Sequence, residues 1–599
     1  MILRFLNEVL PRVSKPSRYI GREINSVVKD PAEVRLRVAL VFPDVYEVGM
    51  SNHGLEILYH VLNAQPDVWA ERSYLPWIDM MEKMRERDVP LFTLESHTPV
   101  KEMDVIGISV ESELLYSNVV EFLKLSKIPL FYWERGENDP IVLGGGPCSS
   151  NPEPVYGFFD AFVVGDGEEV ILEIASLLKE IKGEKRESIW RELSKIEGVY
   201  VPALYEQRGN RVFPIQPGVP EKVRRRVVRD LNAQPVPVRK IVPNMEVVHD
   251  RAVIEISRGC TRGCRFCHAS VFYRPVRERT LENIVENLEE MLRNTGYEEV
   301  SLLSLSAMDH SRIEETVREL VRRFGDQKIA VSIPSTRMDS FGVEIASMIS
   351  AVRKTGLTFA PEAASQRLRN IINKTLTDED IFDSLAAAKD AGWRRVKLYF
   401  MVGLPFETDE DVADIVELLK RVKGMGFKEV SASVSIFIPK PHTPFQFARQ
   451  ITPEEARDKF KILEKARKFA ELSFHNPYMS FLEGILSRGG RELLEVVVEA
   501  NTRGARFDEW SEVFDFGRWR GAFEELGIDP YAYLRERDLN EDLPWDHIDM
   551  GVTREFLVAE YEKAKKGLQT LDCRWNGCFG CGVCPSLKVK NLLAGGDAR

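Results

Sequence analysis

The chain has 599 residues, and a prior of about 150 residues per domain predicts several domains rather than one core. Its net charge of −11 argues against a general electrostatic hold on nucleic acid, although a local basic patch remains compatible with it. The start carries Arg4, Glu8 and Pro11, unlike a signal peptide, and no apolar run approaches the ~18 residues of a membrane helix. We therefore expect a soluble cytoplasmic protein without a membrane partner.

The first part of the chain alternates predicted strands with helices. After a lead-in over residues 1–35, residues 36–184 hold apolar strands at 36–42, 104–110, 141–143 and 161–164. Glycines follow two of these strands, namely Gly144, Gly145, Gly146, Gly165 and Gly167. This pattern predicts a doubly wound, Rossmann-like α/β domain with its ligand at the carboxyl ends of the strands.

Residues 185–250 are predicted to be a connecting segment. Lys222 to Arg229 carries five basic residues, which could touch phosphates or form a solvated face, and Pro235 and Pro237 mark a linker. Residues 251–470 then repeat strand and helix six times, with strands expected at 252–256, 299–305, 329–333, 357–360, 396–401 and 429–437. That spacing predicts a partial (β/α)6 barrel of the TIM type.

The last part, residues 471–599, is predicted to be mainly helical with a cysteine-rich tail. Its grouped aromatic residues, such as Trp510, Trp519 and Phe523, are typical of helix cores. The segment 543–549 lacks periodicity and could cover an active site. Seven of the eight cysteines lie in two tight groups, which in a chain of this kind indicates metal ligands rather than disulfides.

The first cysteine group follows the first barrel strand directly. Cys260, Cys264 and Cys267 have the spacing CxxxCxxC. Three thiolates can hold three irons of a [4Fe–4S] cluster and leave the fourth iron open for a ligand. A structural zinc site, the alternative, normally takes four ligands from its own cluster.

This loop, with Phe266 before the third cysteine, resembles the radical S-adenosylmethionine (radical SAM) superfamily. The resemblance implies a [4Fe–4S] cluster that cleaves SAM reductively to a 5′-deoxyadenosyl radical, fed by a one-electron reductant such as flavodoxin or ferredoxin. It also implies SAM-binding residues near the strand ends. The matching positions are Ser304, Ser306, Ser332, Arg337, Glu362, Lys397, Gly403 and Pro405. His442 follows the sixth strand and could contact the substrate at the mouth of the barrel, or it could simply belong to a rigid turn between prolines.

The N-terminal domain resembles the cobalamin-binding domain that precedes many radical SAM modules. The resemblance implies that the glycines at 144–146, Gly165 and Gly167 approach the cofactor. Domains that replace the lower cobalt ligand carry DxHxxG, whereas this chain has only Ser51-Asn52-His53-Gly54. We therefore expect cobalamin to bind without His53 as a ligand, and a degenerate domain that binds nothing is the alternative.

The second cysteine group ends the chain. Cys573, Cys578, Cys581 and Cys584, followed by Pro585, repeat part of the spacing of bacterial ferredoxins. Four thiolates can saturate a second [4Fe–4S] cluster, and the same CxxC pairs also allow structural zinc.

The leading hypothesis is a cobalamin-dependent radical SAM methyltransferase that acts on an unactivated carbon. The resemblance implies that the radical abstracts a hydrogen and that methylcobalamin supplies the methyl group. Alternatives are non-methylating radical SAM chemistry, such as cyclisation, reduction or RNA modification, with a vestigial cobalamin domain, and a cobalamin- or SAM-responsive binding protein. A methylthiotransferase is disfavoured, because the N-terminal half offers Cys148 alone where that family has three cysteines. The substrate is not identified.

Overall fold

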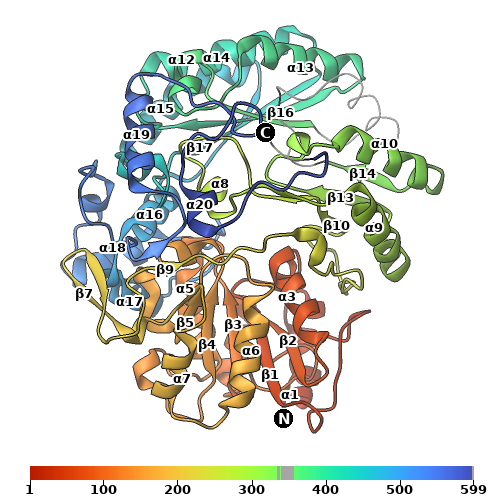
Figure 1. Ribbon diagram of the computed structural model, residues 1–599, viewed down its shortest axis with the longest axis vertical. Coiled ribbons are helices and arrows are strands. Elements are labelled where there is room, and N and C mark those ends of the chain that lie inside the picture. Colours follow the sequence, from red (N-terminus) through yellow and green to blue (C-terminus); the bar gives the residue numbers. More distant parts are fainter. Residues whose placement is uncertain (334–337, 339–356, 597–599) are drawn as a thin grey trace.

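A doubly wound sheet forms the N-terminal part of the chain (Figure 1). The structure is a computed structural model, and it describes residues 1–333, 338 and 357–596. The strand order is β2-β1-β3-β4-β5-β6, with β6 antiparallel to β5 and the other pairs parallel. The strands are β1 (Leu36–Phe42), β2 (Val68–Tyr74), β3 (Val105–Ser109), β4 (Ile141–Gly145), β5 (Ala161–Val163) and β6 (Val199–Tyr200). Since the chain leaves β1 for β2 on one side and later adds β3 on the other, ligands are expected at the carboxyl ends of β1 and β3.

Helices cover this sheet in two groups. α3 contacts α6, and α4 contacts α5. The helices of this part are α1 (Ile2–Val9), α2 (Tyr46–Gly49), α3 (His53–Asn63), α4 (Ile78–Glu86), α5 (Tyr116–Leu125), α6 (Val170–Glu180) and α7 (Arg186–Leu193). α3 begins where the side chain of Asn52 accepts a hydrogen bond from the amide of Leu55, which satisfies one of the free donors of the first turn.

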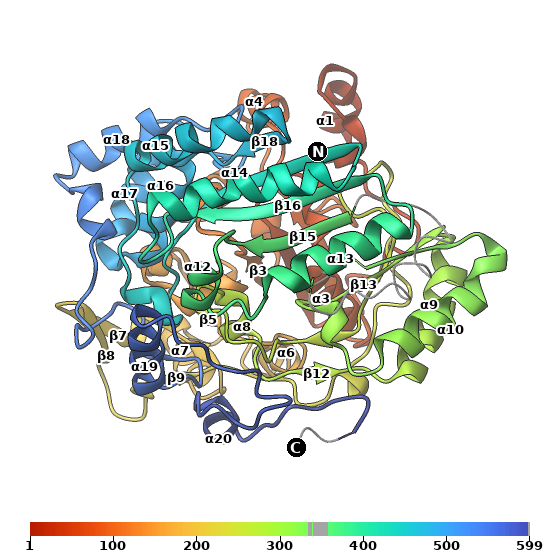
Figure 2. The same ribbon diagram turned by 90° about the horizontal axis from the view of Figure 1, so that it is seen from above.

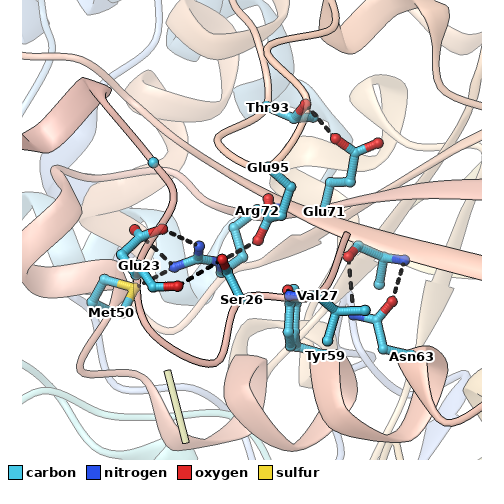
Figure 3. A network of polar contacts seen from close by, with 12 residues as sticks. Glu23, Ser26, Val27, Met50, Tyr59, Asn63, Glu71, Arg72, Thr93 and Glu95 are labelled. Atoms are coloured by element: carbon cyan, nitrogen blue, oxygen red, sulfur yellow. Dashed lines mark hydrogen bonds and ion pairs between the residues drawn. The ribbon is translucent and has the colours of Figure 1, made fainter. Parts of the chain in front are cut away.

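Strand β2 was not predicted from the sequence, because it carries charged residues at fully buried positions. Arg72 reaches from this strand to Glu23 of the lead-in (2.8 Å) and to Glu95 (2.6 Å), as Figure 3 shows. Glu71, beside it, accepts a hydrogen bond from Thr93. Buried charges are tolerated only when they are paired. The network therefore ties the lead-in to the edge of the sheet.

Within the described residues, the central barrel-like module has seven parallel strands in two sheets. The first sheet is β10 (Ala252–Glu255), β13 (Glu299–Leu303) and β14 (Ala330–Ser332). The second is β15 (Leu357–Glu362), β16 (Arg395–Val402), β17 (Glu429–Ile436) and β18 (Glu471–Phe474). β18 adds one strand to the six expected and starts just beyond the expected end of the barrel at residue 470.

Amphipathic helices surround these strands, as Figure 2 shows from above. They include α9 (Leu281–Thr295), α10 (Ile313–Phe324), α13 (Asp378–Asp390), α14 (Asp409–Gly424) and α15 (Pro453–Leu463), with the short α8 (His268–Phe272) and α12 (Gln366–Ile371) at the strand ends. Along β16, Val396, Leu398 and Phe400 are buried in the core, whereas the alternate residues Lys397 and Tyr399 are more exposed. This period of two leaves one face of the strand for the barrel interior. The α/β fold class predicted from the sequence, with a doubly wound sheet and a TIM-type barrel, is confirmed.

The C-terminal helices pack against both other parts. They are α16 (Pro477–Arg488), α17 (Leu494–Thr502), α18 (Phe516–Glu525), α19 (Arg554–Lys565) and α20 (Val583–Leu587). α17 contacts α5 of the N-terminal part, and Phe507, Trp519 and Phe523 are buried in the same core as the N-terminal sheet. α19 instead shares a core with the barrel loops around Phe445 and Phe447. These helices thus hold the sheet and the barrel together.

Short strand pairs complete the connections. They are β7 (Tyr205–Arg208) with β8 (Arg211–Pro214), β9 (Val223–Arg224) with β19 (Ile548–Asp549), and β11 (Ser257–Arg258) with β12 (Arg277–Glu278). Within the described ranges, no helix combines the length and the apolar character needed to cross a membrane.

Candidate active site

The loop of the first cysteine group lies between β11 and α8, and close contacts at Gly259 and at Arg265 fix its position. Gly259 has φ +88°, and a Cβ there would lie 2.3 Å from the carbonyl oxygen of Pro275, so only glycine fits. Arg265 is fully buried and donates hydrogen bonds to the carbonyl oxygen of Ile371 (2.7 Å) and to Glu560 of α19 (3.1 Å). These contacts tie the loop to the end of α12 and to α19.

Cys260, Cys264 and Cys267 all line one cavity of about 290 Å³. Burial raises the pKa of the Cys260 thiol to about 12, helped by Asp309 and Cys264, and burial also raises the pKa of Cys267. These thiols are therefore protonated unless a bound cation displaces their protons, as metal ions do. In the described part of the chain, the thiols of neither cysteine group lie close enough together to form a complete metal site. Three soft sulfur donors on one cavity nevertheless fit an iron–sulfur cluster.

The same cavity contains a carboxylate and an ammonium group. Glu362 ends β15 just after a register shift and has φ +67°, a left-handed conformation that is unusual for glutamate. Lys374 lies 3.2 Å from its carboxylate. Strain of this kind concentrates at functional sites. Such a pair can bind the amine and the carboxylate of an amino acid.

Other residues with predicted roles in SAM binding are divided between cavities. Ser306 and Phe266 line the cysteine cavity, and Ser306 donates a hydrogen bond to Asp309 (2.7 Å). Ser304 shares a hydrogen bond of 2.7 Å with Ser257 and lines the neighbouring cavity described below. Ser332 ends β14, opposite Ser301.

Three further predicted residues are not brought to the cysteines. Gly403 and Pro405 line a separate cavity together with Glu407 and Lys459. The ammonium of Lys397 lies over the ring of Tyr399, 4.9 Å from its centre, and Tyr399 does line the cysteine cavity. Arg337 lies outside the described residues.

His442 is buried rather than exposed at the mouth. Its Nε2 lies 3.0 Å from the carbonyl oxygen of Ser150 in the N-terminal part. Burial lowers the pKa of His442 to about 4. Its position favours the structural alternative.

A second cavity, of about 380 Å³, separates the N-terminal sheet from the barrel. The cavity is open to solvent on one side, and its empty space including this opening is about 1520 Å³. The carboxyl ends of β1, β3, β4 and β5 meet those of β10 and β13 around it, and Leu305 lines both this cavity and the cysteine cavity. The two spaces therefore adjoin at Leu305.

All five predicted glycines line this second cavity, but for different reasons. A Cβ at Gly145 would meet no atom within 4 Å, so this position is open toward the cavity. At Gly144 a Cβ would meet the ring of Phe162 at 2.6 Å, and at Gly165 the carbonyl oxygen of Arg226 at 2.2 Å. Gly146 and Gly167 likewise approach other parts of the chain. Most of these glycines thus serve close packing, and Gly145 is the one that leaves room for a ligand.

Charged residues from the turn after β5 and from the barrel line the second cavity together. Arg258 pairs with Glu168 (2.6 Å), Glu255 (2.7 Å) and Asp166 (3.2 Å). Asp166 also pairs with the fully buried Arg277 (2.5 Å). Although burial raises the pKa of Asp166, these arginines lower it well below its usual value. The network joins the turn after β5 to the cysteine loop.

His53 lies on the other wall of this cavity, in the first turn of α3. Its Nδ1 is 3.2 Å from Glu56, which also pairs with Lys240 (3.1 Å). The histidine is therefore already fixed by a carboxylate.

Sequence reasoning did not find Lys374, Tyr399 or Arg262 as lining residues of the cysteine cavity. Tyr399 could have been found from its position on the inner face of a predicted strand. Lys374 follows the short helix α12, where no pattern signals proximity to the cysteines.

A three-cysteine loop at the carboxyl end of the first strand of a parallel α/β barrel is the arrangement of radical SAM proteins. The chain belongs to the radical SAM superfamily, whose sequence profile matches residues 254–419, and the profile of the N-terminal part of radical SAM proteins matches residues 54–202. It is thus a radical SAM enzyme, which confirms the resemblance seen in the sequence.

The chain is similar to several known proteins. It is 28% identical to the uncharacterized protein MJ0966 of Methanocaldococcus jannaschii, over 82% of this chain and 97% of that protein. It is 24% identical to the uncharacterized methyltransferase PH0819 of Pyrococcus horikoshii, over 53% of this chain and 64% of that protein. Among solved structures, the radical SAM methyltransferase TsrM of Kitasatospora setae, with cobalamin and a [4Fe-4S] cluster bound, matches 70% of this chain and 76% of that chain at 17% identity and a TM-score of 0.49. At that score the likeness to TsrM supports no shared activity.

Proposed function

We propose that this radical SAM enzyme binds a [4Fe–4S] cluster through Cys260, Cys264 and Cys267 and transfers a methyl group to an unactivated carbon with the help of cobalamin. The observation that carries the proposal is the pair of cavities that adjoin at Leu305. One contains the three cysteines, and the other lies at the carboxyl ends of a doubly wound sheet, where such sheets bind cofactors. Two cofactors held in these spaces would face each other.

In the cysteine cavity, the three thiolates would leave one iron open for SAM. A bound and reduced cluster would supply the single electron needed for reductive cleavage of a C–S bond of SAM to methionine and a 5′-deoxyadenosyl radical. Glu362 and Lys374 carry the charges that complement the amine and the carboxylate of the methionine part. Their side chains would orient SAM and not react with it.

In the second cavity, apolar side chains and the open backbone at Gly145 suit the flat face of a corrin ring. A cofactor as large as cobalamin has to use the open side of this cavity as well. Cobalamin bound here supplies a transferable methyl group. The similarity to a protein named as a methyltransferase supports this choice over non-methylating chemistry.

The first test measures SAM cleavage. Anaerobically reconstituted enzyme with SAM and dithionite is expected to release 5′-deoxyadenosine, and the C260A/C264A/C267A variant is expected to release none. Cys148→Ala, which removes a buried cysteine outside both groups, is the matched control and should retain the activity. Cleavage that persists in the triple variant would end the proposal.

The second test addresses cobalamin and methyl transfer separately. Protein purified with cobalamin should show the bound cofactor in its visible spectrum. Incubation with SAM carrying a deuterated methyl group and cell extract should then label a product carbon. Normal 5′-deoxyadenosine release without cobalamin binding or label would support the non-methylating alternative. A one-electron reductant such as flavodoxin or ferredoxin is the proposed partner.

A further inference from the structure

The tail of the chain, residues 568–596, lies against the outside of the first cysteine loop. Arg265 of that loop donates a hydrogen bond to the carbonyl oxygen of Leu568 (2.7 Å). Asn373 donates to the carbonyl oxygen of Thr570 (3.0 Å) and accepts from its amide (2.8 Å). The tail therefore starts beside the residues that anchor the loop.

Further contacts continue along the tail. Arg262, between the first two cysteines of the loop, pairs with Asp572 (3.0 Å). The backbone of Leu592 accepts a hydrogen bond from the amide of Glu278 and donates one to the carbonyl oxygen of Val276, both at 2.8 Å. Figure 2 shows the tail running past β12 to the C-terminus. The tail thus contacts the loop between its cysteines and the residues of β12 that follow it.

Despite these contacts, the tail buries little apolar surface. Its small core consists of Cys581, Val583 and Leu587 with a few partly buried neighbours. Leu571 and Trp575 remain exposed. A segment with so small a core usually needs a metal or a disulfide to fix its structure, and free thiols are what it contains.

The four cysteines lie close together in the sequence, between residues 573 and 584, in a turn-rich stretch, although in the described residues their thiols are not gathered at the spacing of metal ligands. Gly577, Gly580 and Gly582 all have positive φ, which allows tight turns of the backbone between the cysteines. The amide of Gly580 donates to Sγ of Cys578 at 3.4 Å. Sγ of Cys573 accepts from Asn591 (3.7 Å) and donates to the carbonyl oxygen of Thr261 in the first loop (3.9 Å). The two hydrogen bonds donated to sulfur, from Gly580 and Asn591, are typical of the surroundings of metal-bound thiolates.

The geometry points to a second metal site, in which Cys573, Cys578, Cys581 and Cys584 bind a [4Fe–4S] cluster or a Zn²⁺ ion. Four thiolates saturate either group, so this site would not bind SAM. Because Asp572, next to Cys573, pairs with Arg262 of the first loop (3.0 Å), metal binding at the tail also fixes the outer wall of the loop that carries the first cluster. This site is independent of SAM cleavage and would exist even if the proposed function were wrong.

Metal analysis of the C260A/C264A/C267A variant tests the site without the first cluster. About four irons with sulfide per chain would identify an iron–sulfur cluster, and one zinc without sulfide would identify a zinc site. Additional replacement of Cys578 by serine should remove the metal. Cys578 is exposed, so its loss leaves the core of the tail intact. Cys148→Ser is the matched control and should keep the metal. A triple variant free of bound iron and zinc would overturn the site.

Hydrogen–deuterium exchange tests the link to the loop. In the otherwise unchanged chain, Cys578→Ser is expected to raise exchange in residues 568–592 and also in residues 261–276, whereas Cys148→Ser changes neither. Exchange in residues 261–276 that stays at the wild-type level after metal loss would overturn the inference that the tail supports the loop.

Discussion

Replacement of Arg258 by methionine should destabilise the contact between the N-terminal sheet and the barrel. Arg258 is buried and pairs with Glu168, Glu255 and Asp166, and Asp166 keeps Arg277 as a second partner. The variant therefore leaves two carboxylates, Glu168 and Glu255, without this cation. Removing one partner of a buried ion pair costs about 3–5 kcal/mol, and we expect a loss of unfolding free energy in that range at neutral pH.

The pH dependence of this loss follows from Glu255. Burial, the largest single influence, raises its pKa, but Arg258 together with His53 and Arg279 lowers it by more, so that the folded-state pKa lies below the usual value. In the wild type, Glu255 thus contributes stability that is present above its unfolded pKa and is lost as the pH falls through the folded one. In the variant, burial acts without the arginine and raises the pKa of Glu255. Protonation of Glu255 then removes the cost of burying its unpaired charge in the variant. The difference in unfolding free energy between variant and wild type should therefore shrink below about pH 5.

Urea unfolding of the metal-free chain, followed by intrinsic fluorescence at pH 7.5 and pH 5, measures this difference. Arg251→Met is the matched control, because Arg251 forms a partly exposed pair with Glu299 (2.8 Å) and should cost at most about 1 kcal/mol. A loss of less than 1 kcal/mol in Arg258→Met at pH 7.5, or a loss that is the same at both pH values, would refute the reasoning.

Three further predictions concern the cofactors. Gly145→Val should fold normally yet weaken cobalamin binding at least tenfold in a spectroscopic titration, because its side chain enters the open cavity; unchanged affinity would place the cofactor elsewhere. His53→Ala should leave the absorbance of bound cobalamin unchanged, since Glu56 already holds the imidazole, and a clear spectral shift would instead identify a cobalt ligand. Glu362→Gln should raise the KM for SAM about tenfold, which corresponds to about 1.4 kcal/mol, by removing the charge beside Lys374; an unchanged KM and rate of 5′-deoxyadenosine release would exclude a role for Glu362.

Local patterns in the sequence predicted the elements with regular periodicity. β1, β3, β16 and β17 were expected close to where they lie, because continuous or alternating apolar residues determine which face of a strand is buried. The three cysteines were also evident, since metal ligands within one loop have a characteristic spacing. The radical SAM class followed from these two features.

The elements that the sequence missed depend on partners far along the chain. β2 holds Glu71 and Arg72 inside the core, which is acceptable only because Thr93, Glu95 and Glu23 satisfy them. β18 was missed because it is a short strand at the edge of the second sheet, beside β17.

In the candidate site too, some features could be predicted from local sequence and others depend on tertiary contacts. Its cysteines belong to single loops, and their residue type and spacing predict metal binding, whereas the glycine turns did not reveal which of the five glycines leaves room for a ligand. The pairing of Glu362 with Lys374, the orientation of Gly145 and the separation of Gly403 from the cysteines depend on how the loops pack. So does the contact of Cys573 with Thr261, which joins residues 312 positions apart. Sequence periodicity specifies which face of an element is buried, whereas the close packing of these elements decides which distant side chains meet.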